Sequence, residues 1–286
     1  MVNLILTTTA QHFGAYFKDR MGFRIIPLER NKDGKNSFPD GEVYVNVGSS
    51  LLDREGRFIV VHSGAPDPNG GLAELEYILS VLKRANKEIE VFFTYMPYSM
   101  QDKIHAEGET NAAEDLLQKL VQYYGVKKIY AIDPHFHSAS WLSNLPFVSV
   151  SPHGVLTSAV KTDYPDAIFV SPDAGHEKRA QIQGFKKTRT DSYTVTYDSS
   201  SMAHLTGKTV AVVDDIIETG GTMVGFHTAC SVQKPKELVA VVTHGVLPEG
   251  ILRLQKTYVR VYLSNTISRQ EANVDLATLI FQTLSL

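Results

Sequence analysis

The chain has 286 residues, a formal charge of −3 and 43% apolar residues, which is ordinary for a globular protein of one or two domains. The near-neutral charge gives no electrostatic reason to expect nucleic-acid binding, and no apolar run reaches the roughly 20 residues that span a bilayer. The single cysteine, Cys230, excludes an internal disulfide. Because the N-terminus lacks the features of a signal peptide, we expect a cytoplasmic protein.

Short runs of β-branched and aromatic residues recur along the chain and predict a series of strands. Several runs are continuously apolar, which is typical of parallel strands that are covered on both faces. In chain order, the predicted strands are 3–9, 23–28, 42–47, 57–63, 88–95, 127–133, 147–151, 167–172, 193–198, 208–215, 237–245 and 258–264.

Amphipathic stretches separate these runs. Residues 72–85 and 112–125 repeat apolar side chains at helical spacing, and Gly125 is suited to end the second helix. Residues 57–95 and 208–243 follow one plan of strand, glycine-containing turn, helix and strand. We therefore expect an α/β protein with two similar domains, residues 1–145 and 146–286, each a mainly parallel sheet flanked by helices. One continuous sheet of repeated units is the alternative.

The stretch "VAVVDDIIETGGT" (210–222) ends an apolar strand on adjacent carboxylates, Asp214 and Asp215, before glycines and threonines. In open α/β sheets, ligands bind beyond the carboxyl ends of the strands. Glycines at the start of a helix let backbone N–H groups approach an anion, and the helix dipole favours negative charge. The stretch therefore offers acceptors for hydroxyls or a metal beside a phosphate cradle, which suits a sugar phosphate. A threonine-capped turn with two solvated acids is the alternative.

The segment "VVDDIIETGGT" (212–222) resembles the ribose-phosphate binding motif of two groups of enzymes. These are the type I phosphoribosyltransferases and the ribose-phosphate pyrophosphokinases, which make phosphoribosyl pyrophosphate (PRPP). The resemblance implies a phosphoribosyltransferase-like fold for each domain, with the ribose phosphate bound by the C-terminal one. It implies that the ribose hydroxyls and the 5-phosphate are held by Asp214, Asp215, Glu218, Thr219, Gly220, Gly221 and Thr222.

The stretch "FPDGE" (38–42) resembles an N-terminal motif of the pyrophosphokinases in particular. The resemblance implies that Phe38, Asp40 and Glu42 hold the adenine of ATP. Phe38 supplies a flat apolar surface for the base, and carboxylates can accept hydrogen bonds from an exocyclic amine. A Pro-Asp-Gly turn before a strand is the alternative explanation of the same residues.

The stretch "YMPYSMQDK" (95–103) resembles a second pyrophosphokinase segment, which ends in Arg-Gln-Asp-Arg. The resemblance implies that Gln101 and Asp102 contact ATP, and Lys103 also fits the pattern. Met100 stands where the family usually has an arginine that reaches the nucleotide. This departure removes a cation from the expected phosphate site.

The stretch "DPHFH" (133–137) places a carboxylate and two imidazoles at alternate positions. In an extended chain Asp133, His135 and His137 point to one side and could form a metal site, whereas capping of a strand at a loop is the alternative. The stretch resembles a family motif whose histidine contacts the catalytic Mg²⁺, which implies that His135 is a metal ligand. "SPDAGHEKRA" (171–180) resembles a further motif, which implies that Asp173 serves the ribose or the metal.

The stretch "GFKKTRTDSYTV" (184–195) is basic and rich in hydroxyl groups. A solvated loop is the ordinary interpretation. In the pyrophosphokinases this position holds a mobile catalytic loop, which implies that Lys187 and Arg189 are catalytic, with Lys186 as the alternative lysine. A flexible cationic loop is suited to neutralise charge that develops on phosphorus and to exclude water.

The resemblance covers nearly the whole chain, and its motifs stand in family order. It implies a ribose-phosphate diphosphokinase that uses Mg²⁺ and converts ATP and ribose 5-phosphate to AMP and PRPP, without a nucleic-acid or membrane partner. It also implies a homo-oligomer, either a dimer or a multiple of dimers. The alternatives are a phosphoribosyltransferase that consumes PRPP and a catalytically silent regulatory homologue, which Met100 alone favours.

Overall fold

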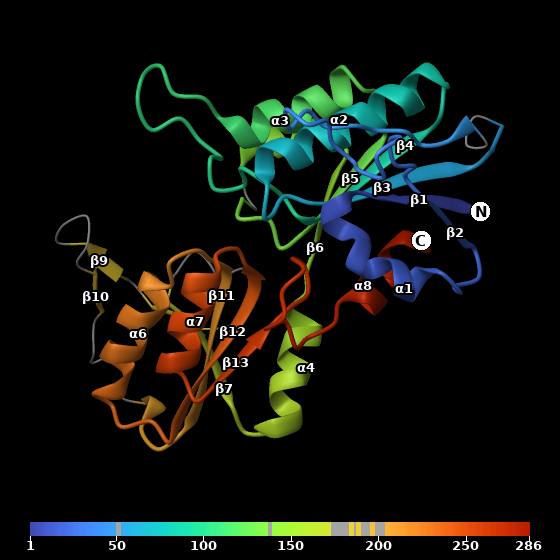
Figure 1. The fold of residues 1–286 in the computed structure, drawn as a ribbon. Helices are drawn as coiled ribbons and strands as arrows, with labels where there is room; N and C mark the ends of the chain where they lie inside the picture. The colour runs from blue at the N-terminus through green and yellow to red at the C-terminus, as the bar shows by residue number, and fades with distance from the viewer. Residues whose placement is uncertain (50–52, 137–138, 173–182, 186, 190–194, 198–203) are drawn as a thin grey trace. The chain divides into compact units, whose positions relative to one another are not determined.

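The structure, a computed structural model, describes residues 1–49, 53–136, 139–172, 183–185, 187–189, 195–197 and 204–286. Contacts between these residues divide the chain into two compact units, which are described separately. The N-terminal unit comprises residues 1–150 together with 266–268 and 280–286, and the C-terminal unit comprises 151–265 and 269–279. Each unit contains its own sheet (Figure 1).

The sheet of the N-terminal unit is parallel throughout and has the order β2-β1-β3-β4-β5-β6. Every residue of β4 is buried, as expected for a strand with helices on both faces. The strands are β1 (Val2–Leu6), β2 (Phe23–Ile26), β3 (Arg57–Ser63), β4 (Ile89–Tyr95), β5 (Lys128–Ile132) and β6 (Phe147–Val150).

Helices α2 (Pro68–Arg84) and α3 (Ala112–Gln122) cover one face of this sheet, and α1 (Gly14–Phe17) lies on the other (Figure 1). The predicted apolar faces of α2 and α3 are in the core, because the leucines that recur at helical spacing are buried against the sheet. The short 3₁₀ helices η1 (Thr8–Phe13) and η3 (Ser140–Asn144) complete the unit. Near the C-terminus, Phe281 packs on Tyr16 and Phe23.

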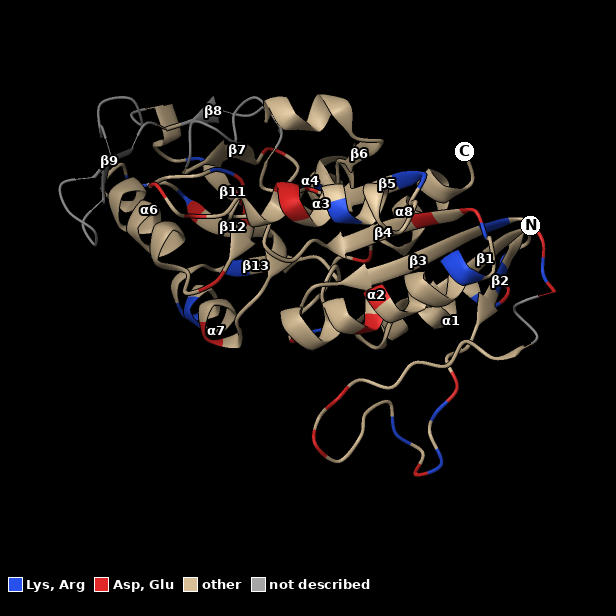
Figure 2. Cartoon of the chain, turned by 90° about the horizontal axis from the view of Figure 1, so that it is seen from above, with Lys and Arg blue, Asp and Glu red and all other residues tan. Residues whose placement is uncertain are grey.

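The prediction of a strand at 42–47 was wrong. The segment between β2 and β3 leaves the sheet as a long excursion with mixed charges (Figure 2), and its ladder pairing is a single bridge between Ser37 and Val43. The alternating pattern of 42–47 is suited to a strand. The side chain of Asn46, however, donates a hydrogen bond to Glu29 Oε2 and accepts one from the N–H of Gly48. A strand requires continuous pairing along its length. The backbone bonds of this segment instead go to separate positions, since Tyr44 donates to the Asn36 carbonyl and Glu29 donates to the Asn46 carbonyl.

The sheet of the C-terminal unit has the order β13-β12-β11-β7-β8, and its strands are also parallel. A separate antiparallel pair is formed by β9 and β10. The strands are β7 (Ile168–Ser171), β8 (Gln183–Gly184), β9 (Lys187–Arg189), β10 (Val195–Tyr197), β11 (Thr209–Ile217), β12 (Glu237–Gly245) and β13 (Arg260–Leu263). The expected α/β class with two mainly parallel sheets is confirmed.

Helices α6 (Gly221–Ser231) and α7 (Pro248–Thr257) pack on one face of this sheet through Met223, Phe226, Ile251 and Leu254, which are buried in the core. Helix α4 (His153–Asp163) packs against β12 and β13. The last helix is α8 (Ala277–Leu284). Within the described part of the chain, no helix has both the length and the apolar character needed to cross a bilayer.

Candidate active site

The two adjacent carboxylates lie at the carboxyl end of β11, as the sequence predicted. This strand runs to Ile217, two residues past its predicted end. It pairs with β7 only at Val210–Val212, so the two aspartates lie beyond this pairing. Successive side chains of a strand point to opposite faces, and accordingly Asp215 is buried while Asp214 is half-buried. The Asp214 Oδ1 atom accepts a hydrogen bond from the N–H of Asp215 at 3.1 Å, and Asp215 Oδ1 accepts from the N–H of Ile216 at 3.0 Å. Each of the two carboxylates is therefore held against the backbone N–H of the residue that follows it.

The loop 218–220 joins β11 directly to helix α6. Gly220 is the N-cap of the helix and has a left-handed backbone with φ of 76°, which glycine adopts without strain. The Gly220 carbonyl accepts the first backbone hydrogen bond of the helix, which the N–H of Val224 donates at 3.0 Å. The N–H groups of the first helical turn have no intrahelical acceptor and are therefore suited to bind an anion. Glu218 and Thr219 are exposed beside them.

The predicted cationic loop is described only in its backbone and only in part. Lys187 and Arg189 are the ends of β9, and they pair with Tyr197 and Val195 of β10. Asp173 and the alternative lysine, Lys186, lie outside the described residues. The catalytic roles of Lys187 and Arg189 stay predictions.

In the N-terminal unit, the stretch "FPDGE" forms a tight hairpin. The N–H of Gly41 donates to the carbonyl of Phe38 at 3.0 Å, and the N–H of Phe38 donates to the carbonyl of Glu42 at 2.8 Å. Gly41 has φ of 94°, so the glycine is required by the turn. The Asp40 Oδ1 atom accepts from the N–H of Glu42 at 3.1 Å, and the ring of Phe38 is 45% exposed at the tip. The hairpin therefore presents an exposed aromatic ring beside two exposed carboxylates.

The predicted nucleotide residues of "YMPYSMQDK" lie in a turn after β4. The N–H of Gln101 donates to the carbonyl of Tyr98, which has φ of 60°. The indole N–H of Trp141 donates to the carbonyl of Asp102 at 3.3 Å and fixes this turn. The side chain of Met100 is 47% exposed, so it fills no core position. The assignment of this turn and of the "FPDGE" hairpin to ATP stays a prediction.

The stretch "DPHFH" does not continue the strand, so the condition for a one-sided arrangement of Asp133 and His135 is not met. Strand β5 ends at Ile132, and Asp133 has φ of 40°, which turns the chain before His135. Asp133 is buried and His135 is half-buried, while His137 lies outside the described residues. Among the residues that are described, no group of three or more His, Cys, Asp or Glu side chains is placed to hold a metal.

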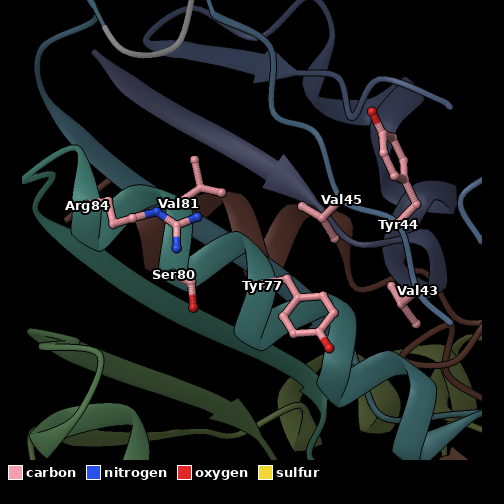
Figure 3. A pocket seen from close by; sticks show the side chains of 7 residues that line it. All are labelled: Val43, Tyr44, Val45, Tyr77, Ser80, Val81 and Arg84. Atoms are coloured by element: carbon pink, nitrogen blue, oxygen red, sulfur yellow. The ribbon is translucent and has the colours of Figure 1, made fainter.

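A cavity of about 430 Å³ lies on the N-terminal unit between the segment 43–45 and helix α2 (Figure 3). Tyr77, Ser80, Val81 and Arg84 line the helix side. Phe38 lies next to this region, because its ring packs edge-on against Tyr44 with centroids 5.7 Å apart. None of the residues predicted to bind ATP lines the cavity, and we do not assign it to the nucleotide.

The junction between β3 and α2 follows the same plan as the junction between β11 and α6. Here Asp67 is the N-cap, and its Oδ1 atom accepts from the N–H of Gly70 at 2.9 Å. Pro68 follows as the first helical residue and has no N–H to offer. Below the helix, His62 is fully buried and its Nδ1 atom lies 3.1 Å from the Thr7 hydroxyl. Burial lowers the pKa of His62 to about 3, so the imidazole is neutral at physiological pH.

Comparison of the sequence with known proteins identifies a matching family model and similar chains. Residues 4–125 match the family model of the N-terminal domain of ribose phosphate pyrophosphokinase. The ribose-phosphate pyrophosphokinase of Pyrococcus abyssi is 28% identical over 255 residues, covering 85% of this chain and 87% of the relative. That of Pyrococcus furiosus is 25% identical over 293 residues and covers 98% of this chain and 100% of the relative.

A solved structure shares the fold. The crystal structure of phosphoribosylpyrophosphate synthetase from Mycobacterium smegmatis matches with a TM-score of 0.83 at 23% identity, covering 99% of this chain and 97% of that one. The two mainly parallel sheets therefore define an α/β protein that shares the fold of this synthetase. The chain is a homologue of the ribose-phosphate pyrophosphokinases, and residues 4–125 belong to their N-terminal domain family.

Proposed function

We propose that this chain is a ribose-phosphate pyrophosphokinase, which transfers the β,γ-diphosphoryl group of ATP to O1 of ribose 5-phosphate. The anomeric hydroxyl attacks the β-phosphorus, a new O–P bond forms, the bond between the β-phosphorus and the α,β-bridging oxygen breaks, and AMP leaves. The observation that carries this proposal is the β11–α6 junction, where two carboxylates stand beside an uncapped helix start. The relatives of the same name support it over most of the chain.

Each part of the junction suits one part of a sugar phosphate. The loop N–H groups and the Thr219 and Thr222 hydroxyls supply donors for the dianionic 5-phosphate. Asp214 and Asp215 supply acceptors for the ribose hydroxyls. Holding the sugar at both ends fixes O1 in space, and positioning together with electrostatic stabilisation accounts for most of the catalysis of phosphoryl transfer by a protein. Glu218 is exposed at the rim and completes the motif.

We assign ATP to the N-terminal domain and ribose 5-phosphate to the C-terminal domain, with the boundary predicted at 145. Phe38, Asp40 and Glu42 hold the adenine in this proposal, and Gln101 and Asp102 contact the nucleotide. Lys187 and Arg189 stabilise the charge that develops on the transferred group. We also propose a homo-oligomer in the cytoplasm, on the basis of the family resemblance.

Transfer between two phosphate-bearing substrates requires divalent charge neutralisation, and we propose that the metal is Mg²⁺. Mg²⁺ is usually held by one or two carboxylates together with waters and substrate phosphates. His135 and Asp173 are the proposed ligands. When bound, Mg²⁺ supplies charge neutralisation of the ATP phosphates.

Phosphorus NMR of the protein mixed with ATP, ribose 5-phosphate and Mg²⁺ tests the function. We expect AMP together with a new sugar-linked diphosphate. ADP or free phosphate instead would contradict the proposal and indicate an ordinary kinase or ATPase. Binding of ribose 5-phosphate without turnover would favour the regulatory homologue, and consumption of added PRPP with a base would favour the phosphoribosyltransferase.

Matched lysine variants test the cationic loop in the same assay. Lys187→Ala should lower kcat by about 100-fold to 1,000-fold, as loss of a transition-state charge donor does elsewhere. Lys186→Ala removes the same charge one position earlier and should leave kcat nearly unchanged. The reverse ranking would transfer the catalytic role to Lys186.

A further inference from the structure

Three successive carbonyl groups, from the last residue of β11 and the first two residues of the loop 218–220, face the segment 246–253. The carbonyl of Ile217 accepts from the N–H of Val246 at 2.9 Å. The carbonyl of Thr219 accepts from Arg253 Nη1 at 3.1 Å. Between them, the carbonyl oxygen of Glu218 lies against the backbone of Gly250. Helix α7 and the residues before it therefore set the orientation of each peptide plane in this loop.

Orientation of the carbonyls decides where the N–H groups point. In a trans peptide the C=O and the following N–H point in opposite directions. Because the carbonyls of 217–219 face segment 246–253, the N–H groups of Glu218, Thr219 and Gly220 face away from it. The left-handed conformation of Gly220 continues this arrangement into the helix, and successive N–H groups that face one side form an anion-binding concavity.

The close contact at Gly250 leaves no room for a side chain. A Cβ atom at this position would lie 1.9 Å from the carbonyl oxygen of Glu218 and 2.9 Å from Cγ2 of Ile217. The first obstacle is backbone, so it can be relieved only by moving the loop or the helix. Gly220 approaches the same point, since its own Cβ would lie 3.3 Å from the Gly250 carbonyl and 3.7 Å from Arg253 Cδ.

We propose that Gly250 and Arg253 are positioning residues for phosphate binding, which act through the backbone of the loop 218–220 and do not touch the substrate. Gly250 lets helix α7 approach closely enough to orient the Glu218 peptide. Arg253 holds the Thr219 carbonyl and keeps the N–H of Gly220 directed at the ligand. The inference rests on the proposed function, because the ligand is taken to be the 5-phosphate of ribose 5-phosphate. Both residues lie outside the motif that the sequence identified.

Calorimetric titration with ribose 5-phosphate, without ATP, tests this role separately from turnover. Gly250→Ala should weaken binding by about 100-fold, because relief of the clash with the Glu218 carbonyl moves several of the loop N–H donors at once and each lost hydrogen bond to a charged group costs about 1.5–3 kcal/mol. Arg253→Met should weaken it by about threefold to tenfold, the effect of one hydrogen bond. In steady-state assays, KM for ribose 5-phosphate should rise while KM for ATP stays constant.

Control variants match each change. Gly225→Ala adds a methyl group to α6 where an added Cβ has open space, and Lys256→Met removes an exposed charge from α7. Both controls should bind ribose 5-phosphate like the wild type. Arg253 is exposed, so Arg253→Met should remain folded. If Gly250→Ala does not fold, the affinity of Arg253→Met for ribose 5-phosphate still tests the inference.

Several results would overturn the inference. Wild-type affinity in Arg253→Met, or an equal loss in Arg253→Met and Lys256→Met, would mean that no specific positioning exists. A matching rise in KM for ATP would indicate a general structural effect. A wild-type protein that binds ribose 5-phosphate but makes no PRPP would refute the proposed function. The affinities of the variants for ribose 5-phosphate would then still decide whether Gly250 and Arg253 position the loop. Failure of the wild type to bind ribose 5-phosphate would overturn both.

Discussion

The two strand–glycine–helix junctions of this chain share a plan but differ in how they satisfy the start of the helix. At β3–α2, Asp67 caps the helix with its own carboxylate and Pro68 removes an N–H group. At β11–α6, the cap is Gly220, which has no side chain, and the N–H groups of the first turn have no intrahelical acceptor. The first junction already holds a negative charge of its own, whereas the second is suited to receive one from a ligand.

The comparison explains why glycine content alone does not identify an anion site. Both junctions are rich in glycine, but Gly70 donates to Asp67 and Gly71 lies against the ring of His62. A Cβ on Gly71 would lie 3.0 Å from His62 Cε1, so this glycine serves packing. An anion site requires glycines whose N–H groups are available to a ligand, as we propose for β11–α6.

The largest effect is expected when the internal cap of the first junction is copied into the second. Gly220→Asp places a carboxylate at the N-cap of α6, where it competes with a phosphate for the same N–H groups and repels it. We expect the Kd for ribose 5-phosphate to rise by at least about 100-fold, measured by calorimetry. Gly220→Asn is the matched control, since asparagine tolerates the left-handed conformation and carries no charge. Equal weakening by both variants would attribute the effect to shape and would contradict the electrostatic distinction.

An intermediate effect is expected from the buried histidine beneath the first junction. The ordinary pKa of a histidine is about 6.5, and burial lowers the pKa of His62 to about 3 in the folded protein. Between these values the unfolded state binds the extra proton, so the free energy of unfolding decreases as the pH falls from about 6.5 towards 3. The contribution is about 1.4 kcal/mol per pH unit.

Denaturant titrations between pH 7 and pH 5 measure this slope. His62→Gln should show a weaker decrease in stability on acidification than the wild type does, whatever its stability at pH 7. Identical pH slopes in the two proteins would show that His62 is not the group responsible.

The smallest effect is expected from removing the internal cap. Asp67→Ala deprives the Gly70 N–H of its acceptor and should reduce the free energy of unfolding by about 1 kcal/mol. Asp67→Ser retains a capping oxygen and should lose less. Neither change should alter the affinity for ribose 5-phosphate, since this cap belongs to the other junction. A changed affinity for the sugar phosphate would remove the functional distinction between the junctions.

Much of the architecture could be predicted because its signals are local. The apolar run 237–245 is the strand Glu237–Gly245, and the glycines at 220–221 begin a helix. The 42–47 stretch had the right alternation for a strand, but it found only one bridge, because pairing depends on what lies beside a segment. At Asp133, a left-handed backbone ends the strand one residue before its predicted end.

The sequence by itself determined the α/β class, the positions of most strands along the chain and the position of the motif at residues 212–222, because periodicity and residue type act over short distances along the chain. Only the tertiary structure decided that Asp67 occupies its own helix start. It also decided that Gly250 and Arg253 orient the loop, although they lie more than 30 positions beyond Glu218 and Thr219 in the chain. Contacts between residues so far apart depend on how helices pack on a sheet, which no local pattern specifies.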